Sequence, residues 1–238
     1  MAEEPEPLAL NRTLNRPDPR ELPAYTVREA AHYLLVPAPT VRYWSVGRDL
    51  WLPLIDVPAH DPVLLSFINL VELHVLASIR REHRVTMPKV REAIDWLRQH
   101  TTDARDRCHP LISRQLETDG LDLFTERYGQ LVNINRDGQF AMRELMSGAL
   151  KRIERDAHGI PIKLYPYTRS SVADAPSMIV IDPTLSGGRP VIAGTGLATE
   201  VIAERYKAGE SVEDLAKDYE RKESEIEEAV RCELGRAA

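Results

Sequence analysis

A glycine-punctuated segment near the C-terminus constrains the fold of this 238-residue chain more than any other feature. Residues 178–196 read Met-Ile-Val-Ile-Asp-Pro-Thr-Leu-Ser-Gly-Gly-Arg-Pro-Val-Ile-Ala-Gly-Thr-Gly. The β-branched run Ile179–Ile181 favours a half-buried strand, and the pair Gly187-Gly188 favours a turn with positive φ. The segment therefore predicts a strand, a glycine turn, a second strand and a corner at Gly194-Thr195-Gly196 that leads into a helix.

These glycines do not match a phosphate-binding loop. A P-loop requires Gly-Lys-Ser or Gly-Lys-Thr at the start of a helix, and the chain contains neither tripeptide. A dinucleotide fingerprint requires a third glycine that does not follow Gly194-Thr195-Gly196. We therefore interpret the glycines as turn residues.

The segment resembles a small uncharacterised domain that is common in bacterial antitoxins, which are typically encoded beside PIN-like nuclease toxins. The resemblance rests on Ile181-Asp-Pro183, Gly187-Gly-Arg-Pro-Val-Ile192, Gly194-Thr195, Ala208-Gly-Glu-Ser211 and Asp218-Tyr219. The chain departs from the usual pattern at Gly196, Ala198 and Glu220, where Arg, Pro and Pro are usual. The resemblance implies that residues 176–238 bind a PIN-like ribonuclease toxin.

Three helices are expected after the glycine corner, at Thr199–Ala208, from Ser211 onward and at Ser224–Leu234. With the hairpin they make a helix-turn-helix-like bundle. Residues 175–238 contain thirteen acidic and eight basic side chains, so this part favours a basic partner over DNA. The candidate toxin-binding residues are Gly187, Gly188, Arg189, Gly194, Thr195, Gly196, Glu200 and Glu204.

Residues 23–45 predict two short helices. Thr26 and Glu29 have the spacing of a capping box at the start of the first helix. Val36-Pro-Ala-Pro39 interrupts that helix, and Thr40 is expected to cap the second. Two short helices with a tight connection predict a helix-turn-helix, whose second helix enters the major groove of DNA.

The stretches Tyr25–Ala31 and Val36–Trp44 resemble the signature of the MerR-type DNA-binding domain. That pattern implies a wing, which we assign to Trp51–Pro58, and two further helices, at Val63–Arg84 and Thr86–His100. The resemblance covers residues 23–100 and implies operator DNA as a partner, while Trp44 is expected to pack in the core. The candidate DNA-binding residues are Arg28, Thr40, Arg42, Tyr43 and Arg48.

A homo-oligomer is expected, because helix-turn-helix proteins read two half-sites one helical turn apart. Residues 63–79 are apolar almost all round a predicted helix, which indicates either burial or an oligomer contact. Leu64–Ile79 is therefore the first candidate contact, and the middle of the chain is the second.

Residues 101–172 predict a small α+β region. Leu121–Ile134 suggests a hairpin, and Asp137-Gly138 marks another turn. Apolar residues in Phe140–Glu154 recur with the period of an amphipathic helix, and Ile160–Tyr165 predicts a strand.

The expected fold class is mainly α with small β-hairpins. Its parts are a flexible tail at 1–22, a MerR-like helix-turn-helix domain at 23–100, a small α+β middle region at 101–172 and an antitoxin domain at 176–238. A polar linker over 168–177 precedes the last of these. No apolar run is long enough to span a membrane, and no signal peptide is recognisable, so we expect a cytoplasmic protein without a membrane partner.

Catalysis is not expected. The seven histidines lack the spacings of local zinc sites, and Cys108 and Cys232 are far apart, so we expect neither a metal nor a cofactor. His74 is expected to be a core residue. Asp182 is interpreted as the start of a turn rather than a catalytic carboxylate.

The two resemblances together predict an antitoxin of a type II toxin–antitoxin system. It would neutralise a PIN-like ribonuclease toxin from the adjacent gene and bind operator DNA to regulate its operon. The alternative is a MerR-like transcriptional regulator that senses a small molecule through its middle region. The sequence shows neither the long coiled-coil helix nor the clustered cysteines that such sensors use, which favours the antitoxin.

Overall fold

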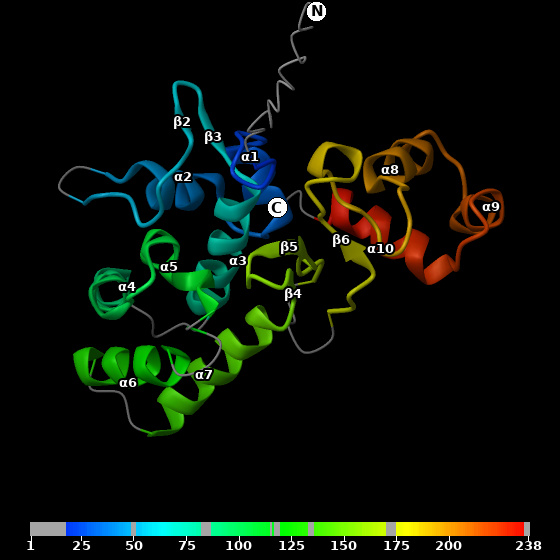
Figure 1. The fold of residues 1–238 in the computed structure, drawn as a ribbon. Helices are drawn as coiled ribbons and strands as arrows, with labels where there is room; N and C mark the ends of the chain where they lie inside the picture. The colour runs from blue at the N-terminus through cyan, green and yellow to red at the C-terminus, as the bar shows by residue number, and fades with distance from the viewer. Residues whose placement is uncertain are drawn as a thin grey trace, which may run out of the picture.

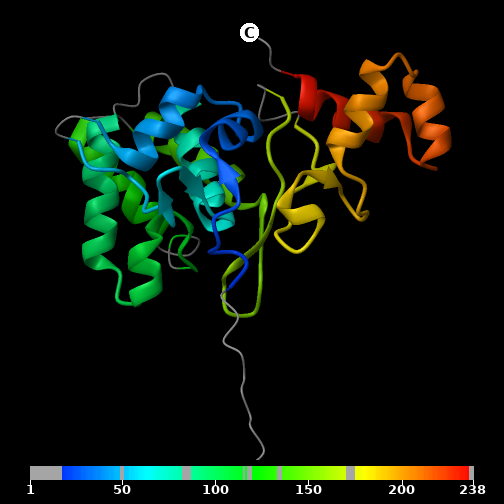
Figure 2. The same ribbon diagram turned by 90° about the horizontal axis from the view of Figure 1, so that it is seen from above.

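The computed structural model describes residues 18–48, 51–81, 87–114, 116, 120–132, 136–169 and 175–235. Within these ranges the chain forms ten α-helices and small antiparallel sheets, in agreement with the mainly α fold predicted from the sequence. Helices α8–α10 gather on one side of the molecule, and short β-strands lie between them and the other helices (Figure 1, Figure 2).

The N-terminal half contains β1 (Tyr25–Thr26), α1 (Val27–Tyr33), α2 (Ala38–Val46), β2 (Ala59–His60), β3 (Val63–Leu65), α3 (Phe67–Arg81) and α4 (Met87–His100). The predicted capping box forms, since the Glu29 amide donates to Thr26 Oγ1 at 3.2 Å and the Thr26 amide donates to Glu29 Oε2 at 2.8 Å. The prediction that Thr40 caps α2 is wrong: Pro37 is the N-cap, and Pro39 lies in the first turn, which suits its fixed φ.

The wing predicted at Trp51–Pro58 is wrong, because these residues form no hairpin. The hairpin is formed by β2 and β3, which belong to an antiparallel sheet of order β1-β3-β2. The preceding residues pack against α2 instead, because the amides of Leu54 and Ile55 both donate to the Trp44 carbonyl, at 2.7 and 3.3 Å. The first residues of the predicted helix Val63–Arg84 form β3 instead, and the helix α3 begins at Phe67.

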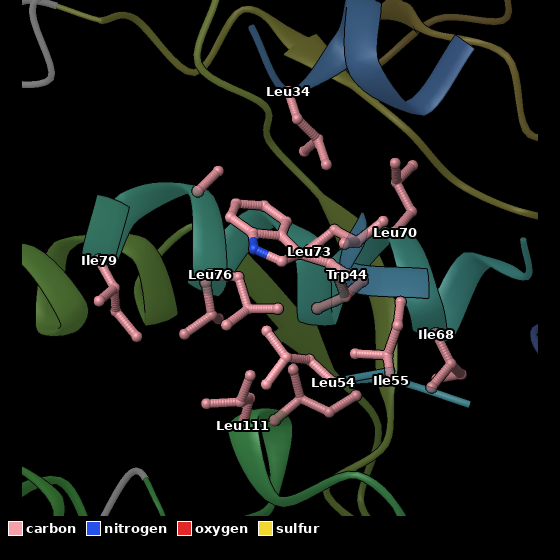
Figure 3. Close-up of a cluster of buried hydrophobic side chains, with 14 of the residues drawn as sticks. Leu34, Trp44, Leu54, Ile55, Ile68, Leu70, Leu73, Leu76, Ile79 and Leu111 are labelled. Atoms are coloured by element: carbon pink, nitrogen blue, oxygen red, sulfur yellow. The ribbon is translucent and has the colours of Figure 1, made fainter. Parts of the chain in front are cut away.

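Helix α3 lies at the centre of the main hydrophobic core. Every residue from Phe67 to Ile79 is buried, and Figure 3 shows leucines of α3 in one cluster with Trp44, which is also fully buried. His74 lies in this core as predicted, stacked on Tyr167 with ring centroids 5.1 Å apart. The interpretation of Leu64–Ile79 as an oligomer contact is wrong, because the same chain already covers this helix.

The middle of the chain contains α5 (Ala104–Cys108), the 3-10 helix η1 (Pro110–Ile112), α6 (Leu121–Val132), α7 (Arg136–Leu150), β4 (Ile153–Arg155) and β5 (Pro161–Leu164). The hairpin predicted at Leu121–Ile134 and the turn at Asp137-Gly138 are wrong, since α6 and α7 occupy the described part of these segments. Phe124 and Tyr128 are buried four residues apart, which is a helical period. The helix predicted at Phe140–Glu154 ends before β4, and β5 confirms the predicted strand.

The C-terminal part contains β6 (Ile179–Val180), the 3-10 helix η3 (Ser186–Gly188), β7 (Val191–Ile192), α8 (Thr199–Lys207), α9 (Val212–Asp218) and α10 (Glu223–Leu234). This order confirms the predicted hairpin and three helices. Most of their apolar core residues form a separate cluster, whereas a larger cluster runs from Tyr25 to Leu164 and also includes Ile181. Leu164 and Ile181 exchange backbone hydrogen bonds of 3.0 and 2.8 Å, which joins β5 to the C-terminal part.

Candidate DNA- and partner-binding surfaces

Helix α2 has an outward face of mixed chemistry. Pro39, Arg42 and Val46 are exposed at positions three and four residues apart, which places them on one side of the helix. Tyr43 is half-buried, and Trp44 is fully buried and serves packing. Arg42 forms no ion pair with any described residue, so its guanidinium is accessible to a molecule bound on α2.

The other predicted DNA-binding residues lie at different distances along the chain from this face, on α2, just after α2 and on α1. Thr40 accepts a 3.0 Å hydrogen bond from Nη1 of Arg80, an exposed α3 residue that the sequence analysis missed. Arg48 is exposed just after α2, where its backbone pairs with Trp51. Arg28 lies on α1 and lines a cavity beside the C-terminal part. Only the packing of α3 against α2 brings Arg80 to this surface, and no local pattern indicates it.

The turn at Gly187-Gly188, here called the glycine turn, contacts β1 and α1. Gly188 is buried at φ +79°, and its carbonyl accepts a hydrogen bond from the Tyr25 hydroxyl at 2.9 Å. Arg189 forms an ion pair with Glu29 and donates to the Tyr33 hydroxyl at 3.3 Å. Gly188 and Arg189, two of the candidate toxin-binding residues, are therefore both engaged within the chain.

The charges at this contact reinforce it. Burial alone would raise the pKa of the Glu29 carboxyl, but hydrogen bonds from Thr26 and Arg189 hold that pKa below its ordinary value. Burial also raises the pKa of the Tyr33 hydroxyl to about 12, so this group remains a neutral hydrogen-bonding partner. One carboxylate, Glu29, thus holds both the start of α1 and the glycine turn.

A cavity of about 310 Å³ lies where α1 meets the C-terminal helices. It brings together Arg28 from the predicted DNA-binding set and Arg189 and Glu200 from the predicted toxin-binding set. Across the same junction, His32 Nε2 lies 3.7 Å from Glu233 Oε2. The two predicted sets therefore meet at one place, which the sequence analysis does not anticipate.

Most of the predicted toxin-binding residues share one accessible surface. We define this surface, the α8 strip, by the exposed residues Leu185, Gly187, Gly194, Gly196, Glu200, Val201 and Glu204. Ser186 Oγ donates to the Gly196 carbonyl at 3.3 Å, which keeps the two glycine-bearing loops adjacent. Val201 is 44% exposed although it is apolar. Glu200 and Glu204 lie one helical turn apart and form no ion pair within the described residues. The strip is thus apolar with an acidic edge.

Three predicted toxin-binding residues do not extend this strip. Gly188 and Arg189 face α1, and Thr195 is half-buried. The Thr195 hydroxyl donates to the Ile192 carbonyl at 2.7 Å, so it stabilises its own loop. The structure therefore divides the predicted set into an inward-facing and an outward-facing group.

Arg152 fixes the segment that leads into the C-terminal part. Its buried guanidinium donates hydrogen bonds of 2.7–3.0 Å to the carbonyls of Tyr165, Pro166, Ala175 and Pro176. The guanidinium also lies over the ring of Tyr167, 4.5 Å from its centroid. Farther along, Arg169 pairs with the buried Glu228 of α10 at 2.6 Å. The linker predicted over 168–177 is therefore held in place on both sides of residues 170–174.

Asp182 acts as a turn residue, as predicted. Its Oδ1 accepts hydrogen bonds from the amide and the hydroxyl of Thr184, at 2.8 and 2.6 Å. In the described ranges, no group of three or more His, Cys, Asp or Glu residues is placed to hold a metal ion. The same ranges contain no helix with the length and apolar character needed to cross a membrane.

The chain is similar to a known family over its C-terminal part and to known proteins over most of its length. Residues 179–231 match a family described as a protein of unknown function, DUF433. A curated protein of Mycobacterium tuberculosis named "Putative antitoxin VapB45" is 28% identical over 226 residues, which cover 84% of this chain and 89% of that protein. The crystal structure of Rv2018 from Mycobacterium tuberculosis has a TM-score of 0.65 at 23% identity, over 88% of this chain and 98% of that one. This last similarity shows a shared fold.

Proposed function

We propose that this chain is an antitoxin of a type II toxin–antitoxin system, which binds operator DNA with one surface and a toxin with another. The observation that carries the proposal is the similarity to a protein named as an antitoxin over 84% of this chain. The outward face of α2 belongs to the N-terminal half and the α8 strip to the C-terminal part, so each partner would have its own surface.

The proposed DNA-binding surface is a winged helix-turn-helix of MerR type, made by α1, α2 and the β2–β3 hairpin. In this arrangement α2 enters the major groove and Arg42 contacts a phosphate or a base edge. Residues 20–100 contain ten basic and nine acidic side chains, so affinity would depend on a few placed arginines rather than on a general positive charge. Arg48 and Arg80 are proposed to flank this contact.

The test of the DNA-binding surface is Arg42→Ala in a gel shift with the chain's own promoter fragment at fixed salt. Loss of one arginine contact should cost about 1–3 kcal/mol of binding free energy. Arg114→Ala is the matched control, because Arg114 is also exposed but lies after η1 in the middle of the chain. Equal affinities for both variants would contradict the proposed role of Arg42.

The proposed toxin-binding surface is the α8 strip. The partner is a PIN-like ribonuclease from the adjacent gene, whose RNA-binding face is expected to be basic. Glu200 and Glu204 would complement that charge, and Val201 would supply apolar contact at the centre. Complementary charge should speed association and make it sensitive to salt.

Co-expression with the adjacent gene product, followed by size-exclusion chromatography, tests the toxin-binding surface. We expect a stable complex that Glu200→Lys/Glu204→Lys weakens by roughly tenfold or more. Glu223→Lys/Glu227→Lys is the matched control, because these exposed glutamates of α10 have the same spacing and charge. Absence of any complex would contradict the antitoxin role, whereas equal behaviour of the two double variants would contradict the α8 strip alone.

A further inference from the structure

A second cavity, which we call the middle cavity, lies outside both proposed surfaces. It has a volume of about 500 Å³ and lies between the start of α3, the α5–η1 segment and the turn of the β4–β5 hairpin. This volume falls within the range of small-molecule pockets, roughly 300–1,000 Å³. Because it is lined by three separate segments of the chain, no sequence motif indicates it.

The middle cavity has an apolar side. Ile68 of α3 and Ile112 of η1 line it and are 2% and 4% exposed, and the half-buried Ile160 joins them from the hairpin turn. Arg114 lies against that turn, since a Cβ placed on Gly159 would be 3.1 Å from Arg114 Cδ. The isoleucines thus provide a surface for an apolar body, with an arginine at its edge.

The polar part of the lining includes His109. Its Nδ1 lies 3.1 Å from Oε2 of Glu72, a residue of α3 that is 1% exposed. This contact fixes the imidazole ring and turns Nε2 away from Glu72, and His109 lines the cavity. Burial opposes the charged imidazolium, but the Glu72 carboxylate outweighs that effect and raises the pKa of His109 above its ordinary value. When the imidazole is protonated, Nε2 is a charge-assisted donor.

Asp103 and Asp106 also line the cavity, and both take part in interactions within the chain. Asp103 Oδ1 accepts the amides of Arg105 and Asp106 at 2.9 and 3.0 Å, where it caps α5. Arg105 pairs with Glu21 at 3.0 Å. Arg114, in contrast, forms no ion pair with any residue that the structure describes, so its positive charge remains for a ligand.

We infer that the middle cavity binds a small organic acid, whose apolar body covers Ile68, Ile112 and Ile160 and whose carboxylate contacts His109 and Arg114. The apolar and cationic sides are both needed, since either alone would hold such a small molecule weakly. This inference goes beyond the proposed function and does not depend on it.

Indole-3-acetate and its neutral amide, indole-3-acetamide, are suitable probes, because they differ only in the charged group. The full-length protein is titrated with each probe at constant ionic strength, while the ring signals of its histidines are followed by NMR. We expect saturable shifts of the His109 and His158 signals with the acid, roughly tenfold weaker binding of the amide, and no shift of His60 on β2.

Arg114→Ala should weaken binding of the acid by roughly tenfold, and Arg42→Ala, an exposed arginine outside the cavity, should leave it unchanged. His109→Gln tests the donor directly, and Arg114→Ala remains decisive if loss of the Glu72 partner prevents folding. Shifts that do not saturate, equal binding of acid and amide, or an unchanged affinity of Arg114→Ala would each overturn the inference.

Discussion

Replacing Gly188 by alanine should destabilise the contact between the glycine turn and α1. At φ +79° an alanine is strained by about 1–2 kcal/mol. Its Cβ would also lie 2.5 Å from the Tyr25 hydroxyl oxygen, and Tyr25 is 1% exposed and has little room to move. Overpacking of this kind costs about 1–3 kcal/mol, so we expect Gly188→Ala to lower the free energy of unfolding by roughly 2–5 kcal/mol.

Gly187→Ala is the matched control for this change. Gly187 has φ +63°, but a Cβ there would meet no atom within 4 Å. It should therefore show only the backbone strain, about 1–2 kcal/mol. The difference between the two variants isolates the contact with Tyr25, and urea denaturation followed by circular dichroism measures it.

A double-mutant cycle with Tyr25→Phe tests the reasoning further. Tyr25→Phe alone leaves the buried Gly188 carbonyl without its donor, which costs about 1–3 kcal/mol. With the hydroxyl removed, the nearest tyrosine ring atom to the new Cβ is Cζ at 3.3 Å, so most of the clash disappears. The double variant should be more stable than the sum of the single effects predicts. Additivity within about 0.5 kcal/mol, or equal costs at Gly187 and Gly188, would refute this account.

Further predictions concern other parts of the chain. Arg152→Leu should cost about 3–5 kcal/mol of unfolding free energy, because it leaves several buried carbonyls without donors, and Arg152→Lys should not restore it, as measured by urea denaturation. Because the folded-state pKa of His109 is raised, its pairing with Glu72 should stabilise the fold fully below pH 6.5 and lose that effect as the pH rises. The loss of unfolding free energy caused by His109→Gln should therefore shrink as the pH rises, and a loss that grows with pH would contradict this prediction. Light scattering should show an oligomer that Phe140→Glu, a change at a 59% exposed residue of α7, converts to a monomer. Residues 176–238 alone should retain the toxin in a pull-down, and retention only by residues 1–175 would contradict this.

Local interactions are the part of this fold that the sequence predicts well. The capping box at Thr26 and Glu29 depends on residues three apart, and the hairpin after Ile179 depends on adjacent turn and strand preferences. Such signals fail where tertiary packing outweighs them. Gly129 suggests a turn, yet it lies inside α6 against the Gln139 side chain, because burial of the apolar face of that helix outweighs glycine's low propensity.

The candidate surfaces are predicted less completely, for a related reason. The sequence identifies Arg42 and Glu200 as surface residues of two different modules, and both are exposed. It does not indicate that Arg189 pairs with Glu29, because 160 residues separate them and neither belongs to a recognisable long-range motif. Nor does it indicate the pairing of His109, just before η1, with Glu72 of the central helix α3. Contacts between distant segments require the packed structure.

The arrangement around Arg152 has a consequence for how this chain can vary in evolution. One guanidinium holds Tyr165 and Pro166 on one side of residues 170–174 and Ala175 and Pro176 on the other. The positions of the two flanks are therefore set by a side chain rather than by the length of chain between them. Insertions there should carry only the small entropic cost of a longer connection, about 0.6 kcal/mol per doubling of its length. Homologous chains can thus differ in length at this site while the C-terminal helices keep their place.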